Sequence, residues 1–333
     1  MTAGALERLV GRCPAVDALK RRIAQVAPSE LRIHVFGETG TGKEQVARAL
    51  HELSPRRGRR FVAVNVAGFS DDLLTAELFG HARGAFTGAV AAREGYVAQA
   101  EGGTLFVDEV ADMSPVAQVR LLRFLQEKEY QRLGETTARK ADVRVISATN
   151  VDLGLCVREG RFRQDLLFRL KDYHLVVPPL RERGHDVLVL ARHFLGQFAR
   201  ARGVPLPVLG PEVQRLLECF PWPGNVRQLE SEMRRLVVIA PGREVKPEDL
   251  SDEFQVPAAV PVGGLRAELL RHEIRILQLA LERHGGVRSR AAAELGITRQ
   301  ALCAKLRRLE GGLGARGAIL PAPRRHLRAP GAA

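Results

Sequence analysis

Cysteine is scarce in this sequence of 333 residues, and long apolar runs are absent from it. No two cysteines form a C-x-x-C pair, and no histidine stands near one at the spacing of a metal ligand. This pattern argues against a disulfide framework or a structural zinc site, and favours reduced thiols at Cys13, Cys156, Cys219 and Cys303. The N-terminus lacks the apolar core of a signal peptide, and no stretch of about 18 apolar residues could span a bilayer. We therefore expect a cytoplasmic protein without a membrane partner.

The composition is otherwise that of a folded protein, with 45% hydrophobic and 27% charged residues. The formal net charge is +13, and it is unevenly distributed. Residues 264–333 contain 14 Lys and Arg against 5 Asp and Glu, so +9 lies in the last fifth of the chain and +4 in the remainder. A basic C-terminal part suits a polyanion such as nucleic acid, although basic segments are often only solvated.

Four short apolar runs alternate with helical patterns in the first half of the chain. Each run has four or five residues rich in Val, Ile, Leu or Phe and ends at a polar or glycine cluster, as buried parallel strands do. The runs are 32–36, 61–64, 104–107 and 143–147. They predict a doubly wound α/β domain over residues 1–177, a parallel sheet flanked by helices, whose ligand lies beyond the carboxyl ends of the strands.

The strand signals stop at Pro178, and helical patterns follow. Three such stretches, separated by prolines, predict an α-helical lid subdomain over residues 178–250. The stretches are 185–201, 211–220 and 225–240. Residues 251–264 lack periodicity and predict a linker. Residues 265–310 predict a small all-α domain, and the Gly-, Ala-, Pro- and Arg-rich residues 311–333 predict a disordered tail.

A glycine-rich turn follows the first apolar run and precedes a helical pattern, which is the context of a phosphate-binding P-loop. Glycines let successive backbone N–H groups turn toward phosphates, and the helix N-terminus adds partial positive charge. Lys43 would reach the β- and γ-phosphates of ATP, whereas Glu44 occupies the position of the Ser or Thr that usually meets Mg²⁺. A turn without a ligand is the simpler alternative. The predicted ATP-binding residues are Gly37, Glu38, Thr39, Gly40, Thr41, Gly42, Lys43 and Glu44.

Two adjacent acids end the apolar run at 104–107. In such an arrangement Asp108 would hold Mg²⁺ for ATP, and Glu109 would polarise the water that attacks the γ-phosphate. Paired acids also end strands by chance, but a P-loop about seventy residues upstream favours the nucleotide interpretation. Asn150 follows the run at 143–147 and is expected beside the attacking water.

The segment 77–89 contains the hexapeptide GAFTGA at 84–89. Two glycines bracket its Phe and Thr, which predicts a loop tip rather than a helix, although a core anchor beside a turn is the alternative. All thirteen residues resemble the sigma-54-dependent enhancer-binding activators, bacterial proteins of the AAA+ ATPase class. In that family the loop contacts sigma-54. The resemblance therefore assigns this contact to Gly84, Ala85, Phe86, Thr87, Gly88 and Ala89.

The resemblance covers residues 9–309 and implies further site residues. Asn65 matches the family's asparagine that pairs with the catalytic glutamate, here Glu109. Arg227, in the sequence WPGNVR, matches a sensor that contacts the γ-phosphate from the lid. Two arginines in FRQDLLFRL match the fingers that reach the nucleotide of a neighbouring subunit, although helical arginines more often form surface ion pairs. They are Arg163 and Arg169.

The C-terminal domain is expected to hold three helices with a basic outer face. Ser289 is predicted to cap the second helix and Thr298 the third, with Gly296 in the turn between them. Polar side chains on the third helix suit contacts in the DNA major groove. The domain also resembles the Fis-type helix-turn-helix of these activators, and a dimerisation module is the alternative. The predicted DNA-binding residues are Ser289, Thr298, Arg299, Gln300, Lys305 and Arg308.

Together these features predict an ATP-dependent activator that binds upstream double-stranded DNA and remodels sigma-54 RNA polymerase holoenzyme to the open complex. The resemblance implies a homo-oligomer, hexameric when active and dimeric when inactive. Because only eight residues precede Leu9, we expect no receiver domain, and control by a separate regulatory protein or by assembly. An AAA+ remodeller of another target fits GAFTGA less well, and a repressor with a vestigial ATPase fits the complete ATPase motifs less well.

Overall fold

The computed structural model describes residues 3–69, 71–86, 89–255, 276–277, 280–281, 283–284, 287–302 and 305. Thr87, Gly88 and Arg308, the predicted linker from Val256 onward and the predicted tail lie outside the described residues. The chain divides into two compact units, residues 1–255 and 256–333, and each is described by itself.

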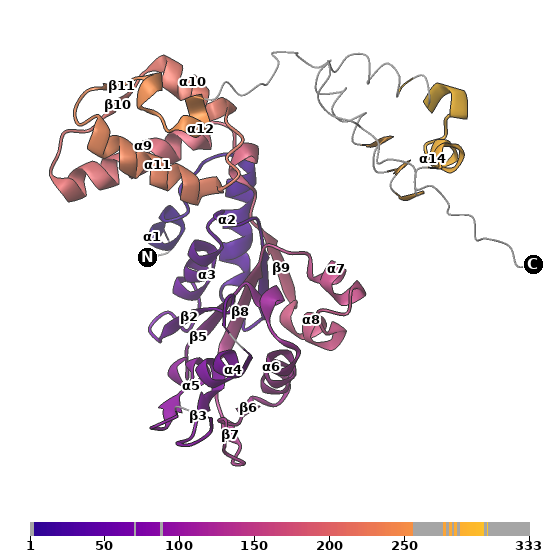
Figure 1. Ribbon diagram of the computed structural model, residues 1–333. Helices are drawn as coiled ribbons and strands as arrows, with labels where there is room; N and C mark the ends of the chain where they lie inside the picture. The colour runs from indigo at the N-terminus through magenta and orange to yellow at the C-terminus, as the bar shows by residue number, and fades with distance from the viewer. Residues whose placement is uncertain are drawn as a thin grey trace, which may run out of the picture. The chain divides into compact units, whose positions relative to one another are not determined.

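A five-stranded sheet forms the centre of the first unit (Figure 1). Its order is β2-β5-β8-β1-β9, and every neighbouring pair is parallel, so the predicted parallel α/β fold is confirmed. β9 was not predicted: among the described strands it pairs only with β1, and its Tyr173 and His174 interrupt the apolar pattern. The strands are β1 Ile33–Phe36, β2 Phe61–Asn65, β5 Thr104–Asp108, β8 Arg144–Thr149 and β9 Tyr173–Val176.

Both faces of the sheet are apolar because alternate side chains of a strand point to opposite sides. In β5, Leu105 and Val107 join the core beneath α4 to α8, whereas Phe106 joins the core beneath α2 and α3. Within the part of the chain that the structure describes, no helix is long and apolar enough to cross a membrane. The helices of this part are α1 Ala3–Glu7, α2 Pro14–Val26, α3 Lys43–Glu52, α4 Asp71–Phe79, α5 Tyr96–Gln99, α6 Pro115–Glu127, α7 Leu153–Arg158 and α8 Gln164–Leu170, with the 3-10 turn η1 Val110–Asp112.

Two short antiparallel hairpins extend from the sheet domain. One joins β3 to β4 and contains the GAFTGA hexapeptide, and the other joins β6 to β7. The Ala82 N–H donates to the Leu133 carbonyl at 2.8 Å, so the two hairpins lie side by side. Their strands are β3 Gly80–His81, β4 Arg93–Glu94, β6 Glu129–Tyr130 and β7 Arg139–Lys140.

The lid is a helical subdomain (Figure 1), and its core contains the fully buried Trp222. Trp222 contacts the rings of Phe220 and Phe254, and its indole N–H donates to the Leu217 carbonyl at 2.8 Å, which satisfies the buried polar atom. The three predicted helices are present with ends within two residues of the predicted ones. The elements are η2 Leu180–Glu182, α9 Asp186–Arg202, β10 Val208–Leu209, α10 Pro211–Cys219, α11 Asn225–Ile239, β11 Glu244–Val245, η3 Pro247–Asp249 and α12 Asp252–Gln255.

The predicted linker starts too early. Residues 252–255 form α12, and Phe254 is buried against Phe220 and Trp222 in the lid core. The lack of periodicity misled the prediction, because a single helical turn is too short to display a period. Phe254 in the lid core and a hydrogen bond from the Gln228 amide to Glu253, at 2.8 Å, attach this turn to the lid.

The second unit contains a small apolar core formed by Leu277, Ala280, Leu281, Ala291, Ala292 and Leu302. Helix α14 spans Arg288–Glu294, and Gly296 has a positive φ of 64° in the turn that follows, as predicted. The Thr298 hydroxyl accepts the Ala301 N–H at 3.1 Å, which matches its predicted cap. The predicted Ser289 cap is wrong: the helix begins two residues earlier than that cap requires, at Arg288, with Val287 in the N-cap position.

Candidate nucleotide site

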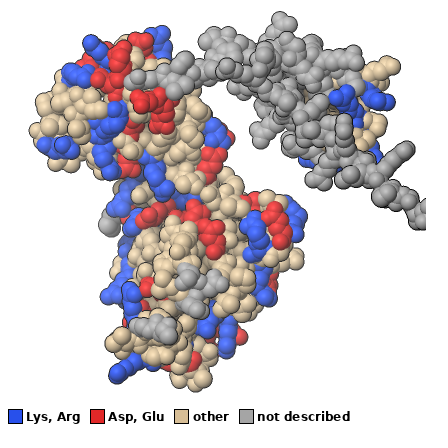
Figure 2. Space-filling view, in the orientation of Figure 1, with Lys and Arg blue, Asp and Glu red and all other residues tan. Residues whose placement is uncertain are grey.

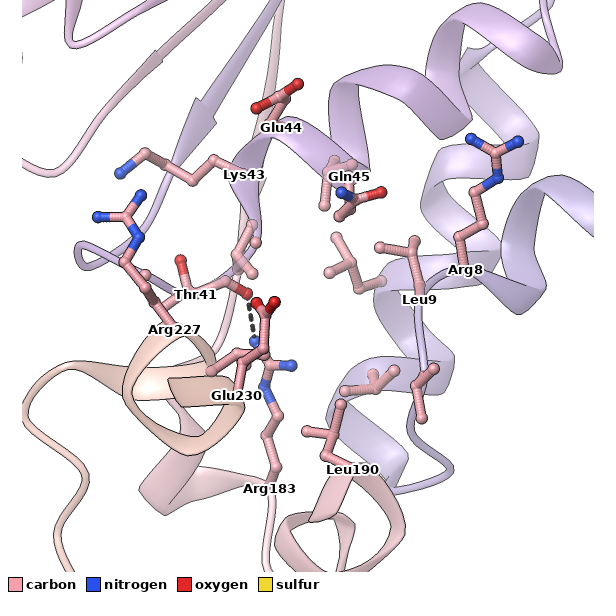
Figure 3. Close-up of a pocket in the computed structure, with 18 of the residues that line it drawn as sticks. Arg8, Leu9, Thr41, Lys43, Glu44, Gln45, Arg183, Leu190, Arg227 and Glu230 are labelled. Atoms are coloured by element: carbon pink, nitrogen blue, oxygen red, sulfur yellow. Dashed lines mark hydrogen bonds between the residues drawn. The ribbon is translucent and has the colours of Figure 1, made fainter. Parts of the chain in front are cut away.

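A cavity of about 890 Å³ lies between the P-loop, the carboxyl ends of two strands and the lid. The volume falls within the roughly 300–1,000 Å³ of small-molecule sites. Figure 3 shows Lys43 and Arg227 directed to the same side of this cavity, with Leu9 and Leu190 across from them. This end therefore holds two cations, beside the carboxylates of Asp108 and Glu109. The side with Leu9 and Leu190 is called the apolar end. The apolar side chains that line the cavity are Leu9, Val10, Val16, Leu19, Leu190 and Phe194, and the same elements add polar ones, Glu7, Arg8, His193 and Gln197.

Lys43 is the first residue of α3 and is buried. Its ammonium donates to the Gly37 carbonyl at 3.0 Å and lies 3.4 Å from a carboxylate oxygen of Glu109. Gly40 and Gly42 have φ angles of 77° and 96°, a backbone conformation that is strained for any residue with a side chain. Predicted ATP-binding residues 39–44 all line the cavity. The glycine-rich turn, the lysine and the helix N-terminus thus converge as a phosphate site requires.

Glu38 is the predicted P-loop side chain that points elsewhere. Its carboxylate accepts hydrogen bonds from Arg181, at 2.8 Å, and from the Asn225 amide, at 3.1 Å. The hydrogen bond from Arg181 is the main reason that the pKa of Glu38 falls to about 2. Glu38 therefore stays ionised at neutral pH and joins the P-loop to the lid, and it does not line the cavity.

The acids Asp108 and Glu109 end β5 beside the P-loop lysine. Glu109 has a φ of 55°, an unusual value for a residue with a side chain, and its N–H donates to the Asp108 carboxylate at 3.0 Å. Burial, followed by the nearby charge of Glu109, raises the pKa of Asp108. A cation at this position would relieve that cost.

The two asparagines predicted for catalysis differ in placement. Asn150 donates from its side chain to the Thr39 hydroxyl at 2.9 Å, and its N–H donates to Glu109 at 3.2 Å, so it joins the P-loop to the acid. Asn65 lines the cavity, but its side-chain oxygen accepts the Ala67 N–H at 2.9 Å. Among the described residues, no hydrogen bond joins Asn65 to Glu109 as predicted. Glu109 lies instead beside Lys43, and a full charge is the stronger partner.

The carboxylates present fit a magnesium ion that is shared with a substrate. Mg²⁺ is usually bound by one or two carboxylates together with substrate phosphates and water. The described residues contain no group of three His, Cys, Asp or Glu that could enclose a metal, so a fully protein-built site is not found among them. Asp108 is the carboxylate best placed for such a shared ion. Glu44 lines the cavity, but its carboxylate accepts two hydrogen bonds from Arg48.

Besides Arg181, the lid contacts the P-loop through Arg227, for which a role was predicted, and through Arg183 and Asn225, for which none was. Arg227 lines the cavity as predicted, and its N–H donates to the Gly40 carbonyl at 3.2 Å. Arg183 is buried, which lowers its pKa, and donates to the Thr41 carbonyl at 2.9 Å (Figure 3). Asn225, which is fully buried, donates to the Thr39 carbonyl at 3.0 Å. Asn225 lies in the WPGNVR segment and at the start of the predicted helix 225–240, but only Arg227 of that segment was assigned a role.

The N-terminal wall of the cavity is attached to the lid. Asp186, in the first turn of α9, accepts the N–H groups of Arg12 and Cys13 at 2.7 and 3.0 Å. Although burial opposes it, these hydrogen bonds lower the pKa of Asp186. Val10 packs on the lid core, whereas Leu9 packs on the core of the sheet domain. The apolar end of the cavity is therefore built from both subdomains.

The two predicted arginine fingers lie on the surface of α8 and do not line the cavity of their own chain. Arg163 is the N-cap residue and forms an ion pair with Asp165 at 2.8 Å, while its N–H donates to Gln118 at 2.9 Å. Arg169 is exposed in the last helical turn. Any contact of either arginine with a nucleotide in this cavity would be with that of another subunit.

The described part of the GAFTGA segment is a tight turn. The Gly84 N–H donates to the Ala89 carbonyl at 2.8 Å, and the Ala89 N–H donates to the Phe86 carbonyl at 3.0 Å. The Phe86 ring is 37% exposed and meets the His81 ring edge to face, with centroids 5.0 Å apart. Ala85 lies in the same turn, and Thr87 and Gly88 lie outside the described residues. A partly exposed aromatic ring is thus presented beside the second hairpin.

In the second unit the predicted DNA-binding side chains are largely on the surface. Ser289, Thr298, Arg299 and Gln300 are exposed, and Lys305 is half-buried. Arg308 lies outside the described residues. In the first unit, by contrast, basic and acidic side chains are interleaved over the face seen in Figure 2.

Three family profiles match consecutive parts of the chain. A profile described as "Sigma-54 interaction domain" matches residues 9–176, one described as "AAA+ ATPase lid domain" matches residues 181–261, and one described as "Bacterial regulatory protein, Fis family" matches residues 271–309.

Curated proteins of similar sequence match nearly the whole chain. The transcriptional regulatory protein ZraR of Escherichia coli (strain K12) is 44% identical over 302 residues, which cover 90% of this chain and 68% of the relative. The DNA-binding transcriptional regulator NtrC of Bradyrhizobium sp. is 42% identical over 334 residues, which cover 91% of this chain and 69% of the relative. Among solved structures, NtrX from Brucella abortus in complex with ATP has a TM-score of 0.70 at 35% sequence identity. The match covers 90% of this chain and 69% of NtrX.

Proposed function

The chain belongs to the sigma-54-dependent transcriptional activators, with a AAA+ domain and a Fis-type DNA-binding helix-turn-helix, and from this premise we propose that it couples ATP hydrolysis to remodelling of sigma-54 RNA polymerase. The product is the open promoter complex. The proposal rests above all on the cavity in which a P-loop lysine, two strand-end acids and a lid arginine meet.

ATP fits the chemical division of this cavity. The triphosphate would lie against the P-loop, Lys43 and Arg227, where backbone N–H groups and two cations meet its charge. The base would lie between Leu9 and Leu190 at the apolar end. NtrX, which binds ATP and ADP in its solved structures, shares this fold. Mg²⁺, bound beside Asp108, would neutralise charge on the phosphates.

Glu109 is the proposed general base. Its position beside Lys43 holds the carboxylate at the phosphate end of the cavity, and the Asn150 N–H fixes its orientation. In this position it can take a proton from a water molecule that attacks the γ-phosphate. Arg163 and Arg169 of a neighbouring subunit would add fixed positive charge to the transition state. A homo-oligomeric ring, proposed as a hexamer, follows from that requirement.

The hairpin that contains GAFTGA is the proposed output surface. Phe86 offers an apolar side chain for sigma-54, and Thr87 adjoins it in the sequence. The helix-turn-helix would hold the ring near the promoter by binding upstream double-stranded DNA through Arg299, Gln300 and Lys305. Binding should weaken with salt, because contacts to phosphates release counterions.

The test is open-complex formation by purified sigma-54 RNA polymerase on a promoter with an upstream binding site. The full chain with ATP should yield open complexes, and a non-hydrolysable ATP analogue should not support them. Lys43→Ala should lose both hydrolysis and open complexes, whereas Thr87→Ala should hydrolyse ATP without yielding them. Open complexes that form equally well without ATP would contradict the proposal.

A further inference from the structure

Three consecutive carbonyl groups of the P-loop are hydrogen-bonded to the lid region. Thr39 O accepts from the Asn225 side chain at 3.0 Å, Gly40 O from the Arg227 N–H at 3.2 Å, and Thr41 O from Arg183 at 2.9 Å. The backbones of the P-loop and of the lid also lie very close together here. A Cβ atom added to Gly40 would be only 2.4 Å from the Gly224 carbonyl oxygen. The lid therefore holds the backbone of the P-loop, in addition to carrying Arg227.

These carbonyls set the direction of the N–H groups that would meet the phosphates of a bound nucleotide. In a planar trans peptide, the carbonyl of one residue and the N–H of the next point in opposite directions. A carbonyl of Thr39 held by the lid thus aims the Gly40 N–H away from the lid, and the Thr41 carbonyl does the same for Gly42. Neither of these two N–H groups has a partner among the residues that the structure describes.

The conformation and side chain of Asn225 suit its contact with the Thr39 carbonyl. It is fully buried with a φ of 52°, a conformation that asparagine tolerates better than most residues. Its side-chain oxygen accepts the Leu180 N–H at 2.8 Å, and its amide nitrogen donates to Glu38 and to the Thr39 carbonyl. One side chain thus joins the start of the lid to the P-loop with both polar atoms in use.

We propose that Asn225 is a positioning residue that sets the phosphate-binding geometry of the P-loop through the Thr39 carbonyl, so that the place of the lid determines affinity for the β- and γ-phosphates. The inference rests on the proposed ATPase function. It assigns Asn225 no contact with ATP. It also makes the lid and the phosphate site interdependent, because displacement of the lid would release all three carbonyls together.

The experiment measures dissociation constants of the full chain for ADP and AMP by displacement of a fluorescent ADP analogue. Asn225→Gly keeps the backbone conformation and removes the side chain. It should weaken ADP binding about tenfold, or about 1.4 kcal/mol, and AMP binding by less than about twofold, because AMP lacks the phosphate that the Gly40 and Gly42 N–H groups would meet.

Asn225→Asp is a second variant for the case that Asn225→Gly folds poorly. It keeps the acceptor for Leu180 but loses the donor, and it places a carboxylate beside Glu38. Combining it with Glu38→Gln removes the repulsion and should still leave the tenfold loss for ADP. Leu236→Ala is the matched control, since Leu236 is fully buried in the lid core on the same helix. It should lower the melting temperature while ADP affinity stays within about twofold of wild type.

Equal losses for ADP and AMP in the Asn225 variants would overturn the inference, as would a loss in Leu236→Ala as large as in Asn225→Gly. Unchanged ADP affinity in both Asn225→Gly and Asn225→Asp would do the same. A wild-type protein that binds neither nucleotide would instead overturn the proposed function, so the two failures are distinguishable.

Discussion

Replacing Gly40 by alanine should push the lid away from the P-loop. The new Cβ atom would lie 2.4 Å from the Gly224 carbonyl oxygen and 3.1 Å from Cβ of Arg227. Real Cβ contacts are no shorter than about 3.0 Å, so the lid turn must move by at least about 0.6 Å. The Arg227 N–H would then lose its 3.2 Å hydrogen bond to Gly40. Backbone strain at a φ of 77° adds to this cost.

The size of the effect follows from these two contributions. An L-residue in the left-handed region costs about 1–2 kcal/mol, and a lost backbone hydrogen bond costs about 0.5–1.5 kcal/mol. Gly203→Ala is the control, because Gly203 has a φ of 65° at the end of α9, but a Cβ atom added there would meet no atom within 4 Å. It should show only the backbone cost and bind ATP normally. Gly40→Ala should be destabilised further and bind ATP at least about tenfold more weakly. Unfolding and ATP titrations that do not distinguish the two variants would refute the steric argument.

Three further predictions follow from the placement of single side chains. Glu109→Gln should bind ATP yet release phosphate at least about 100-fold more slowly, and an unchanged rate would remove Glu109 as the base. Arg163→Ala should slow hydrolysis about 10³-fold while ATP affinity of dilute protein is retained, and the exposed Arg158→Ala serves as its control. The imidazole of His34 is buried beside the Ser147 hydroxyl, and burial lowers its pKa from 6.5 to about 3. As the pH falls below about 6.5, this histidine therefore takes up a proton in the unfolded chain but not in the folded one, and the free energy of unfolding decreases. His34→Asn should lose about 2 kcal/mol less than wild type between pH 7 and pH 5 in urea unfolding; identical pH profiles would contradict this.

The sheet could be predicted where strands are buried on both faces. β5 and β8 consist almost wholly of buried residues, so their apolar runs are visible without knowledge of the partner strands. Within the described sheet β9 pairs on one side only, and its half-buried Tyr173 and His174 give no such run. Local hydropathy reports burial rather than pairing, and an edge strand is paired without being fully buried.

Residues of the site, too, could be predicted only where the signal is local in the sequence. Lys43 could be placed because the P-loop is continuous in sequence, and Asp108 because its strand ends in an acid. Asn225 lies 186 residues from the Thr39 carbonyl that it holds, and nothing local to either residue indicates the contact. The contacts of Glu109 were likewise not predictable from its own segment, because Lys43 and the Asn150 N–H come from elements 66 and 41 residues away in the sequence.

The attachment of the N-terminal wall to α9 has a consequence for how this molecule unfolds. Because Val10 packs on the lid core and Leu9 on the core of the sheet domain, a nucleotide between them would contact residues of two separate apolar cores. Ligand binding then stabilises the junction as well as either core, by an amount that grows with the logarithm of ligand concentration. Without nucleotide the lid and the sheet domain should melt in separable steps, and at saturating nucleotide the two steps should merge into one.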